Sequence, residues 1–151
     1  MVENIKHMEK VTEGMSDSLS ISVPSKPEYV SVVRLAASSI ASRIGFDVEQ
    51  IEDIKVAVAE ACTNAIQHGL CNNCENYNIT FYIDKDKLTI HIVDKGNGFS
   101  YKKLRNPDVT TLKEGGLGIF IIKSLMDEVE VMSDLGKGTS VKMIKYLGDG
   151  C

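Results

Sequence analysis

Apolar residues change their spacing along this chain, and each change predicts a different element. Residues 19–23 alternate apolar and polar side chains, which is typical of a half-buried strand, and Pro24 ends it. From Pro27 the apolar positions recur at helical spacing until Ile44, where Gly45 is a plausible C-terminal stop. Asp47 can cap a second helix that ends near residues 68–69.

Both helices have an apolar stripe that we expect to face the core. In the first helix it consists of Val30, Val33, Leu35, Ala37, Ile40, Ala41 and Ile44. In the second helix it consists of Ile51, Ile54, Val58, Ala61 and Ala65.

The residue pattern in the second half of the chain predicts mainly strands. Residues 77–83 and 88–94 form two strands with a turn at 84–87, and residues 128–133 and 139–146 form a final hairpin. A third helix covers residues 116–126, after a long irregular stretch of the kind that usually forms a functional lid or is disordered. The order of these helices and strands along the chain predicts a two-layer α/β sandwich with a mixed, largely antiparallel sheet and helices on one face.

Length and charge restrict the class of protein. The 151 residues suit one domain, which we place at residues 19–147 between a flexible N-terminal arm (1–18) and a C-terminal tail (148–151). The net charge of −4 argues against nucleic acid as the main partner, and the local basic cluster of Lys102, Lys103 and Arg105 is small. No apolar run approaches the roughly 18 residues of a membrane-spanning helix, and residues 1–18 do not resemble a signal peptide, so we expect a cytoplasmic protein.

The cysteines leave a metal site open as an alternative. Cys62 lies in an apolar helical stretch and is expected to be buried. His68, Cys71 and Cys74 could supply three zinc ligands, but a fourth ligand is not evident. A polar loop with two reduced thiols is the favoured interpretation.

The second helix carries the first motif, residues 60–64. Glu60, Asn64 and His68 are four residues apart, so each step turns only about 40° around the helix. A glutamate on a helix is usually a solvated charge, but Glu60 emerges from a surface of small apolar residues and can accept a proton during phosphoryl transfer. Asn64 offers a neutral oxygen to Mg²⁺. His68 either faces a nucleotide or interacts with the dipole of the helix end, and we favour the second.

The second motif, residues 94–98, begins where an alternating strand ends. Asp94 can accept a hydrogen bond from the exocyclic amino group of adenine. Gly96 and Gly98 allow a sharp turn or a close approach to a flat ligand. Taken alone, an Asx turn with two glycines explains the motif better.

The third motif, residues 115–118, leads directly into the third helix. Glycines before a helix present unobstructed backbone N–H groups to anions, which predicts a phosphate site. Thr139 opens the last strand and can reach the adenine side of this pocket. Arg105, in the irregular stretch, is our choice to neutralise the terminal phosphate, because guanidinium can bind phosphate oxygens bidentately.

Together these motifs resemble the three boxes of the ATPase fold shared by gyrase, Hsp90, histidine kinases and MutL. Within this GHKL superfamily, the chain is similar to bacterial anti-sigma factors that are also serine-protein kinases, of the kind that controls the general-stress sigma factor sigma-B. The stretches that carry this resemblance are residues 27–30, 51–55, 60–68, 115–118 and 125–129. The resemblance covers about residues 19–147.

The resemblance implies a homodimer that binds ATP and Mg²⁺ and holds a sigma factor away from RNA polymerase. It also implies phosphorylation of a serine on a STAS-type anti-anti-sigma protein. By position, Glu60 would be the catalytic base, Arg105 would touch the terminal phosphate and Asn64 would ligate Mg²⁺. The implied nucleotide-binding residues are Asn64, Asp94, Gly96, Gly98, Gly116, Leu117, Gly118 and Thr139.

Two other functions remain open from the sequence. The ATPase half of a histidine kinase needs an upstream helical hairpin with a phosphoacceptor histidine, and only His7 precedes the predicted domain. A pure binding module would use ATP structurally and sequester a partner without catalysis. The pair of Glu60 and Asn64 disfavours this module, because binding alone does not require a base.

Overall fold

The computed structural model describes residues 17–68, 76–95, 117–134 and 138–148. The elements follow in the order β1 (Asp17–Pro24), the 3-10 helix η1 (Pro27–Tyr29), α2 (Val30–Ile44), α3 (Val48–His68), β2 (Asn76–Ile83), β3 (Lys87–Asp94), α5 (Leu117–Leu125), β4 (Glu128–Asp134) and β5 (Gly138–Tyr146).

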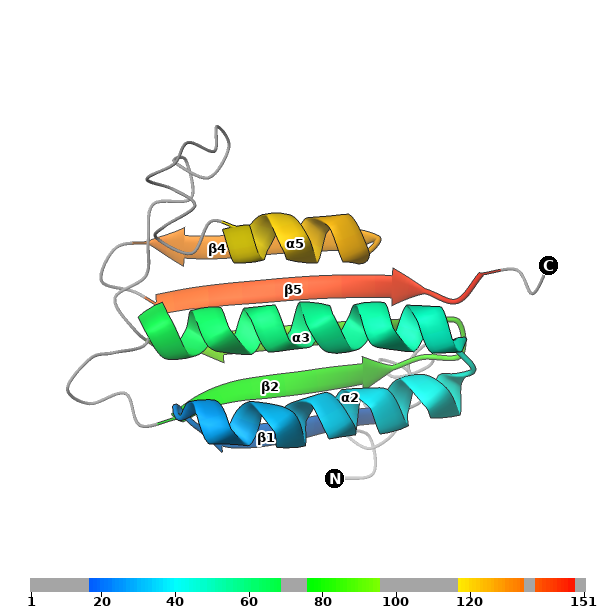
Figure 1. The fold of residues 1–151 in the computed structure, drawn as a ribbon, viewed down its shortest axis with the longest axis horizontal. Helices are drawn as coiled ribbons and strands as arrows, with labels where there is room; N and C mark the ends of the chain where they lie inside the picture. Colours follow the sequence, from blue (N-terminus) through cyan, green and yellow to red (C-terminus); the bar gives the residue numbers. More distant parts are fainter. Residues whose placement is uncertain (1–16, 69–75, 96–116, 135–137, 149–151) are drawn as a thin grey trace, which may run out of the picture.

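The strands form one sheet in the order β1-β2-β3-β5-β4. Every pairing between the described strands is antiparallel. The three helices α2, α3 and α5 cover the same face of this sheet (Figure 1). The predicted two-layer α/β sandwich with helices on one face is therefore confirmed.

Helix α2 confirms the predicted start and stop signals, with one error in its buried stripe. Pro27 opens the 3-10 turn, and Gly45 follows the helix with φ of 114°, a left-handed conformation that favours glycine. Leu35 was expected to be buried, but 69% of its surface is exposed. The residue lies two positions after the buried Val33, which places it on the opposite side of a 3.6-residue helix.

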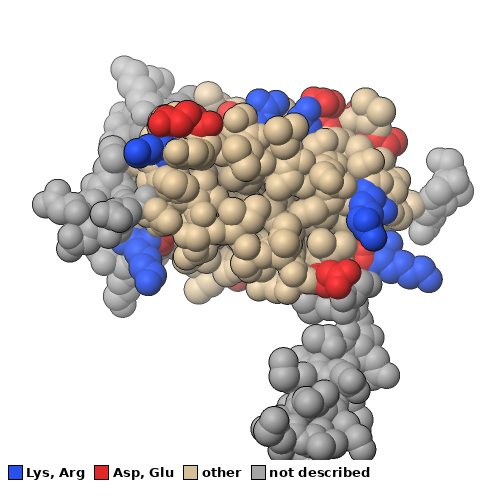
Figure 2. Space-filling view, turned by 90° about the horizontal axis from the view of Figure 1, so that it is seen from below, with Lys and Arg blue, Asp and Glu red and all other residues tan. Residues whose placement is uncertain are grey.

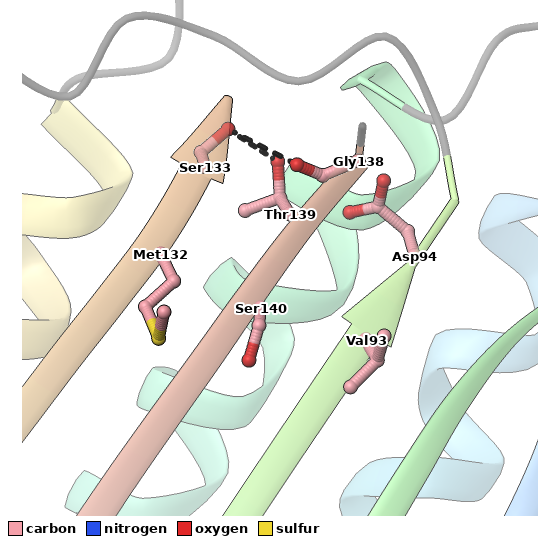
Figure 3. A pocket seen from close by; sticks show the side chains of 7 residues that line it. All are labelled: Val93, Asp94, Met132, Ser133, Gly138, Thr139 and Ser140. Carbon is pink, nitrogen blue, oxygen red and sulfur yellow. Dashed lines mark hydrogen bonds between the residues drawn. The ribbon is translucent and has the colours of Figure 1, made fainter. Parts of the chain in front are cut away.

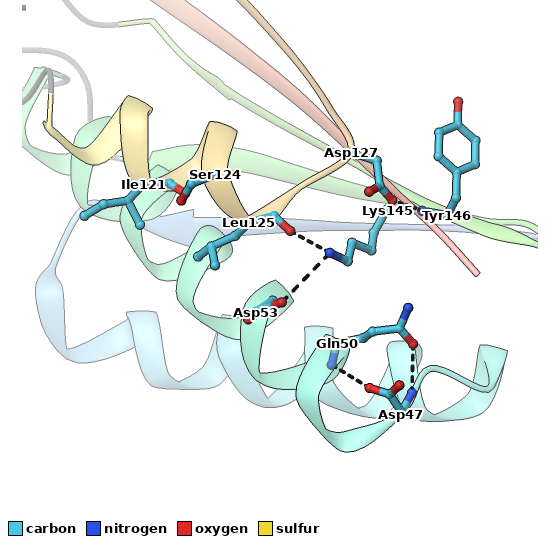
Figure 4. Close-up of polar contacts among 9 residues, drawn as sticks. All are labelled: Asp47, Gln50, Asp53, Ile121, Ser124, Leu125, Asp127, Lys145 and Tyr146. Atoms are coloured by element: carbon cyan, nitrogen blue, oxygen red, sulfur yellow. Dashed lines mark hydrogen bonds and ion pairs between the residues drawn. The ribbon is translucent and has the colours of Figure 1, made fainter. Parts of the chain in front are cut away.

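Helix α3 begins at a reciprocal capping arrangement. The backbone N–H of Gln50 donates to Asp47 Oδ1 at 2.8 Å, and the backbone N–H of Asp47 donates to Gln50 Oε1 at 3.1 Å (Figure 4). Both bonds satisfy donors that the helix itself leaves unpaired. The predicted cap at Asp47 is confirmed.

The core lies between α3 and the centre of the sheet. Its fully buried members include Ile54 and Val58 of α3, Phe81 of β2 and Ile90 of β3. Cys62 is also fully buried, as predicted, and this burial raises the pKa of its thiol to about 11. Burial likewise raises the pKa of the neighbouring Tyr77.

A polar cluster fixes α5 relative to α3 and β5. Lys145 Nζ donates to the carbonyl oxygen of Leu125, the last residue of α5, at 2.7 Å and lies 3.9 Å from Asp53 Oδ2 on α3 (Figure 4). The backbone N–H of Tyr146 donates to Asp127 Oδ2 at 2.7 Å. Since these contacts hold the C-terminal end of α5, they determine where its N-terminal end lies.

Candidate functional site

Four element ends meet at one end of the molecule. The C-terminal ends of α3 and β3 lie there, together with the N-terminal ends of α5 and β5 (Figure 1). Helix α3 packs against α5, β3 and β5. The motifs that the sequence analysis singled out on these elements are therefore brought to the same region.

On α3, Glu60 and Asn64 lie one turn apart. Asn64 is buried, with 6% of its surface exposed, and Glu60 is half-buried. The amide nitrogen Nδ2 of Asn64 is buried and has no hydrogen-bond partner in the described part of the chain. A buried amide without a partner is costly unless a ligand or water completes it, so this side chain is suited to a bound group.

Gly118 of α5 lies directly against these two side chains. A Cβ atom added to Gly118 would lie 3.1 Å from Glu60 Oε2 and 3.1 Å from Asn64 Nδ2. The first and third motifs are therefore in contact, and the absence of a side chain at Gly118 leaves room for both polar groups.

A second contact joins the end of β3 to the start of β5. Asp94 faces Thr139 directly in the antiparallel register, and each has 6% of its surface exposed. Gly138 has φ of +86°, and a Cβ atom there would lie 2.3 Å from the carbonyl oxygen of Asp94. Only glycine fits this close approach, which keeps Asp94 and Thr139 side by side.

Ser133, at the end of β4, extends this contact. Its Oγ lies 2.9 Å from Thr139 Oγ1 and donates to the carbonyl oxygen of Gly138 at 3.4 Å (Figure 3). The sequence analysis did not select Ser133. The predicted hairpin register offered a signal, because it places residue 133 opposite residue 139.

The open pocket in Figure 3 lies at this end of the sheet and has residues of both sheet faces in its lining: Val93, Asp94, Met132, Ser133, Gly138, Thr139 and Ser140. Successive strand residues point to opposite faces, so Asp94, Thr139 and Ser133 share the helix-covered face. We build the site on this row, because two of its members are buried polar groups and the helix motifs lie on the same side.

Several predicted site residues lie outside the described residues: Gly96, Gly98, Arg105, Gly115 and Gly116. The same holds for Cys71 and Cys74 and for the side chain of His68, so the zinc alternative stays a prediction. Among the described side chains, no group of three His, Cys, Asp or Glu residues could hold a metal ion. Leu117, at the start of α5, has 52% of its surface exposed.

The arrangement combines a carboxylate and an amide on α3 with a second carboxylate and a hydroxyl on the sheet. Gly118, at the start of α5, lies against the α3 pair, and a helix N-terminus favours anions. The half beside α5 therefore suits an anionic group, and the half beside Asp94 offers acceptors and a hydroxyl to a polar group. None of the described helices is long and apolar enough to cross a membrane.

The chain is similar to known proteins over most of its length. The sequence matches the profile of the histidine kinase-like ATPase domain over residues 23–145. It is 41% identical over 142 residues to the serine-protein kinase RsbW of Bacillus pumilus, and the match covers 87% of this chain and 86% of that protein. The serine-protein kinase RsbW of Staphylococcus aureus is 41% identical over 145 residues, which cover 89% of this chain and 90% of that protein.

Solved structures show the same fold. The crystal structure of the RsbU and RsbW domains of a Mycobacterium tuberculosis protein superposes with a TM-score of 0.65 at 18% identity. That match covers 87% of this chain and 33% of the solved chain. A histidine kinase domain from Erythrobacter litoralis superposes with a TM-score of 0.52 at 18% identity, covering 93% of this chain and 69% of that one.

Proposed function

This chain belongs to the histidine kinase-like ATPase family, within the RsbW group of serine-protein kinases, and we propose that it phosphorylates an antagonist protein and sequesters a sigma factor. The phosphoryl donor is ATP, and the acceptor is a serine of a STAS-type anti-anti-sigma protein. The observation that carries this proposal is the contact between Gly118 and the Glu60–Asn64 pair. It joins a carboxylate, an amide and a helix N-terminus, which are the groups that phosphoryl transfer needs.

The adenine base of ATP binds beside Asp94. A carboxylate accepts hydrogen bonds only, which suits the exocyclic amino group of adenine. The burial of Asp94 and its position opposite Thr139 support this assignment. Gly96 and Gly98 would follow the base along the turn after β3.

The phosphates lie toward α5. Gly116, Leu117 and Gly118 would offer backbone N–H groups at the helix N-terminus, where anions are favoured. The free space at Gly118 supports this part of the proposal. Arg105 would contact the terminal phosphate from the stretch between β3 and α5.

Magnesium fits the residues at this site. Asn64 supplies an amide oxygen, and its buried Nδ2 has no hydrogen-bond partner in the described structure, which fits a side chain that a bound group would complete. Mg²⁺ prefers oxygen ligands and is usually held by few protein groups together with phosphate oxygens and water. When bound, the ion would neutralise charge on the phosphates.

Glu60 is the general base. Its Oε2 lies beside the position that a Cβ of Gly118 would fill, so the carboxylate points to the space in front of the helix N-terminus. From there it can accept the proton of the attacking serine hydroxyl. The chemical contribution of this chain is thus to orient ATP and to hold one proton at Glu60.

The partners are proteins of the cytoplasm: a sigma factor, the antagonist and a second copy of this chain. Figure 2 shows the side of α2 and β1, where charged side chains lie mainly at the margins. Exposed apolar residues of these elements include Leu19, Val32 and Leu35. A face with few charges at its centre and with exposed apolar residues supports contact with other proteins.

Transfer of radiolabelled phosphate from ATP to a purified STAS-type protein tests this function. We expect label on a serine of the partner with the unmodified chain. Glu60→Gln should lower the transfer rate roughly 100-fold or more, because it removes the base while keeping the shape of the side chain. ATP binding should be retained.

Two results would contradict the proposal in different ways. Tight binding of the partner without transfer would indicate a binding module, and label on a histidine of this chain would indicate a histidine kinase. Undiminished transfer by the Glu60→Gln variant would remove Glu60 from its role and leave the kinase activity standing.

A further inference from the structure

Helices α3 and α5 run antiparallel, because the C-terminal end of α3 lies beside the N-terminal end of α5 (Figure 1). Polar groups connect the two helices near each end of α5. At the N-terminal end, Glu60 of α3 lies against Gly118 of α5. At the C-terminal end, Lys145 of β5 bridges Asp53 of α3 and Leu125 of α5 (Figure 4). The function proposed above uses the first contact and gives the second no role.

The two contacts have the same spacing on both helices. On α3, Glu60 follows Asp53 by seven residues. On α5, Leu125 follows Gly118 by seven residues. Seven residues make about two helical turns, so the members of each pair share one side of their helix and lie about 10 Å apart. A shift of α5 along its axis therefore changes both contacts together.

Apolar packing by itself does not determine this axial position. Ile119 and Ile122 bury one side of α5 in the core, but hydrophobic attraction has no preferred direction. A hydrogen bond does have a preferred direction and distance. Lys145 Nζ donates to the carbonyl oxygen of Leu125 at 2.7 Å. Leu125 is the last residue of α5, where carbonyl groups lack partners within the helix and a cation is favoured.

Lys145 is itself held in place. Its side chain is 12% exposed, and its Nζ lies 3.9 Å from Asp53 Oδ2. The residue belongs to β5, whose backbone pairs with β3 on one side and with β4 on the other. A mostly buried ammonium group on an inner strand is therefore a fixed point for the end of α5.

We propose that Lys145 is a positioning residue for phosphoryl transfer. Its bridge from Asp53 to the Leu125 carbonyl sets the axial position of α5. This position in turn sets the space between Gly118 and the Glu60 carboxylate. The inference rests on the kinase function proposed above, and it gives a role in that function to a group at the opposite end of α5 from the site.

Rates of phosphate transfer to the STAS-type protein at saturating ATP test this role. Lys145→Met keeps the length of the side chain but removes the donor. It should lower the rate about tenfold or more, because small displacements of reacting groups are costly. Lys145→Arg keeps a cationic donor and should recover most of the rate. Asp53→Asn leaves the Leu125 bond in place, so it should lower the rate by a smaller factor.

A double variant with Lys145→Met and Gly118→Ala shows whether the effect passes through α5. The effects of distant, independent substitutions multiply, so two tenfold losses would combine to about 100-fold. We expect the double variant to stay within about threefold of Gly118→Ala alone. The reason is that a helix released at Leu125 can shift to accommodate the new methyl group.

Two controls separate positioning from stability. Lys142→Met removes an exposed lysine of the same strand, and it should leave the rate within about twofold. Asp47→Ala removes the cap of α3 at the end of that helix far from the site. It should lower stability and leave the transfer rate of the folded chain unchanged.

A multiplicative loss in the double variant, or an unchanged rate in Lys145→Met, would overturn the inference. An equal loss of rate in Asp47→Ala would overturn it as well, because stability alone would then explain the effect. A failure of the proposed function is a different result, in which the unmodified chain transfers no phosphate.

Discussion

At the scale of single residues, the site depends on side chains that are small or absent. Gly118 leaves the space that Glu60 and Asn64 use, and Gly138 permits the approach of β5 to Asp94. A larger residue at either position would push the neighbouring polar groups out of place without removing them.

Gly118→Ala should therefore reduce activity while the fold is kept. The new methyl group would lie 3.1 Å from Glu60 Oε2 and from Asn64 Nδ2, so both side chains must move. We expect the rate of phosphoryl transfer to fall about tenfold or more, because small displacements of reacting groups are costly. Alanine favours helices over glycine by up to about 1 kcal/mol, so stability should not fall.

Transfer assays and urea unfolding of the same Gly118→Ala sample measure both effects. Gly148→Ala is the control, since a Cβ at Gly148 meets no atom within 4 Å. Full activity of Gly118→Ala would show that the space beside Glu60 is not needed.

At the scale of elements, local signals predicted the helices and strands well. Asp47 and Gln50 cap α3, Gly45 follows α2, and the stretches predicted as the first three strands became β1, β2 and β3. These signals depend on residues close in sequence, which explains their success. Leu35 was wrongly predicted to be buried because it is apolar and lies near the buried stripe in the sequence. Burial depends on the angle around the helix, and that angle puts Leu35 on the exposed side.

The cap of α3 can be tested by itself. Asp47→Ala should lower the free energy of unfolding by about 1 kcal/mol, because the N–H of Gln50 loses its acceptor. Asp47→Asn should keep most of the stability, since asparagine caps equally well. Urea unfolding with an unchanged m-value measures the difference. Equal stability of the alanine and asparagine variants would contradict this role of the cap.

At the scale of the whole molecule, the sequence singled out motifs that the structure brings to one end of the molecule, but it did not predict how they touch. Glu60, Asn64, Asp94 and Thr139 were selected from their residue types and their places on elements. The contact of Gly118 with α3 depends on how α5 packs, which Lys145 influences from the far end of the helix. Ser133 was missed although the predicted hairpin places it opposite Thr139, because residue type alone does not separate this serine from the others on the strands.

Two buried aspartates lie at opposite ends of β3. Asp94 ends β3, whereas Asp84 lies in the turn before this strand, and both carboxylates are buried. Only Asp94 has Thr139 opposite it, and it stands at the C-terminal end of β3, where α3 also ends. Burial alone therefore does not identify the site, and Asp84 offers a matched comparison.

The affinity of an Asp94→Asn variant for Mg²⁺ and ATP tests the central claim most directly. Asparagine keeps only one acceptor oxygen and loses the charge that strengthens the bond to the amino group of adenine, so we predict that calorimetry shows at least about tenfold weaker binding. Asp84→Asn should bind ATP as the unmodified chain does. Equal affinity of the Asp94→Asn variant and the unmodified chain would contradict the claim that this end of the sheet holds the adenine of ATP.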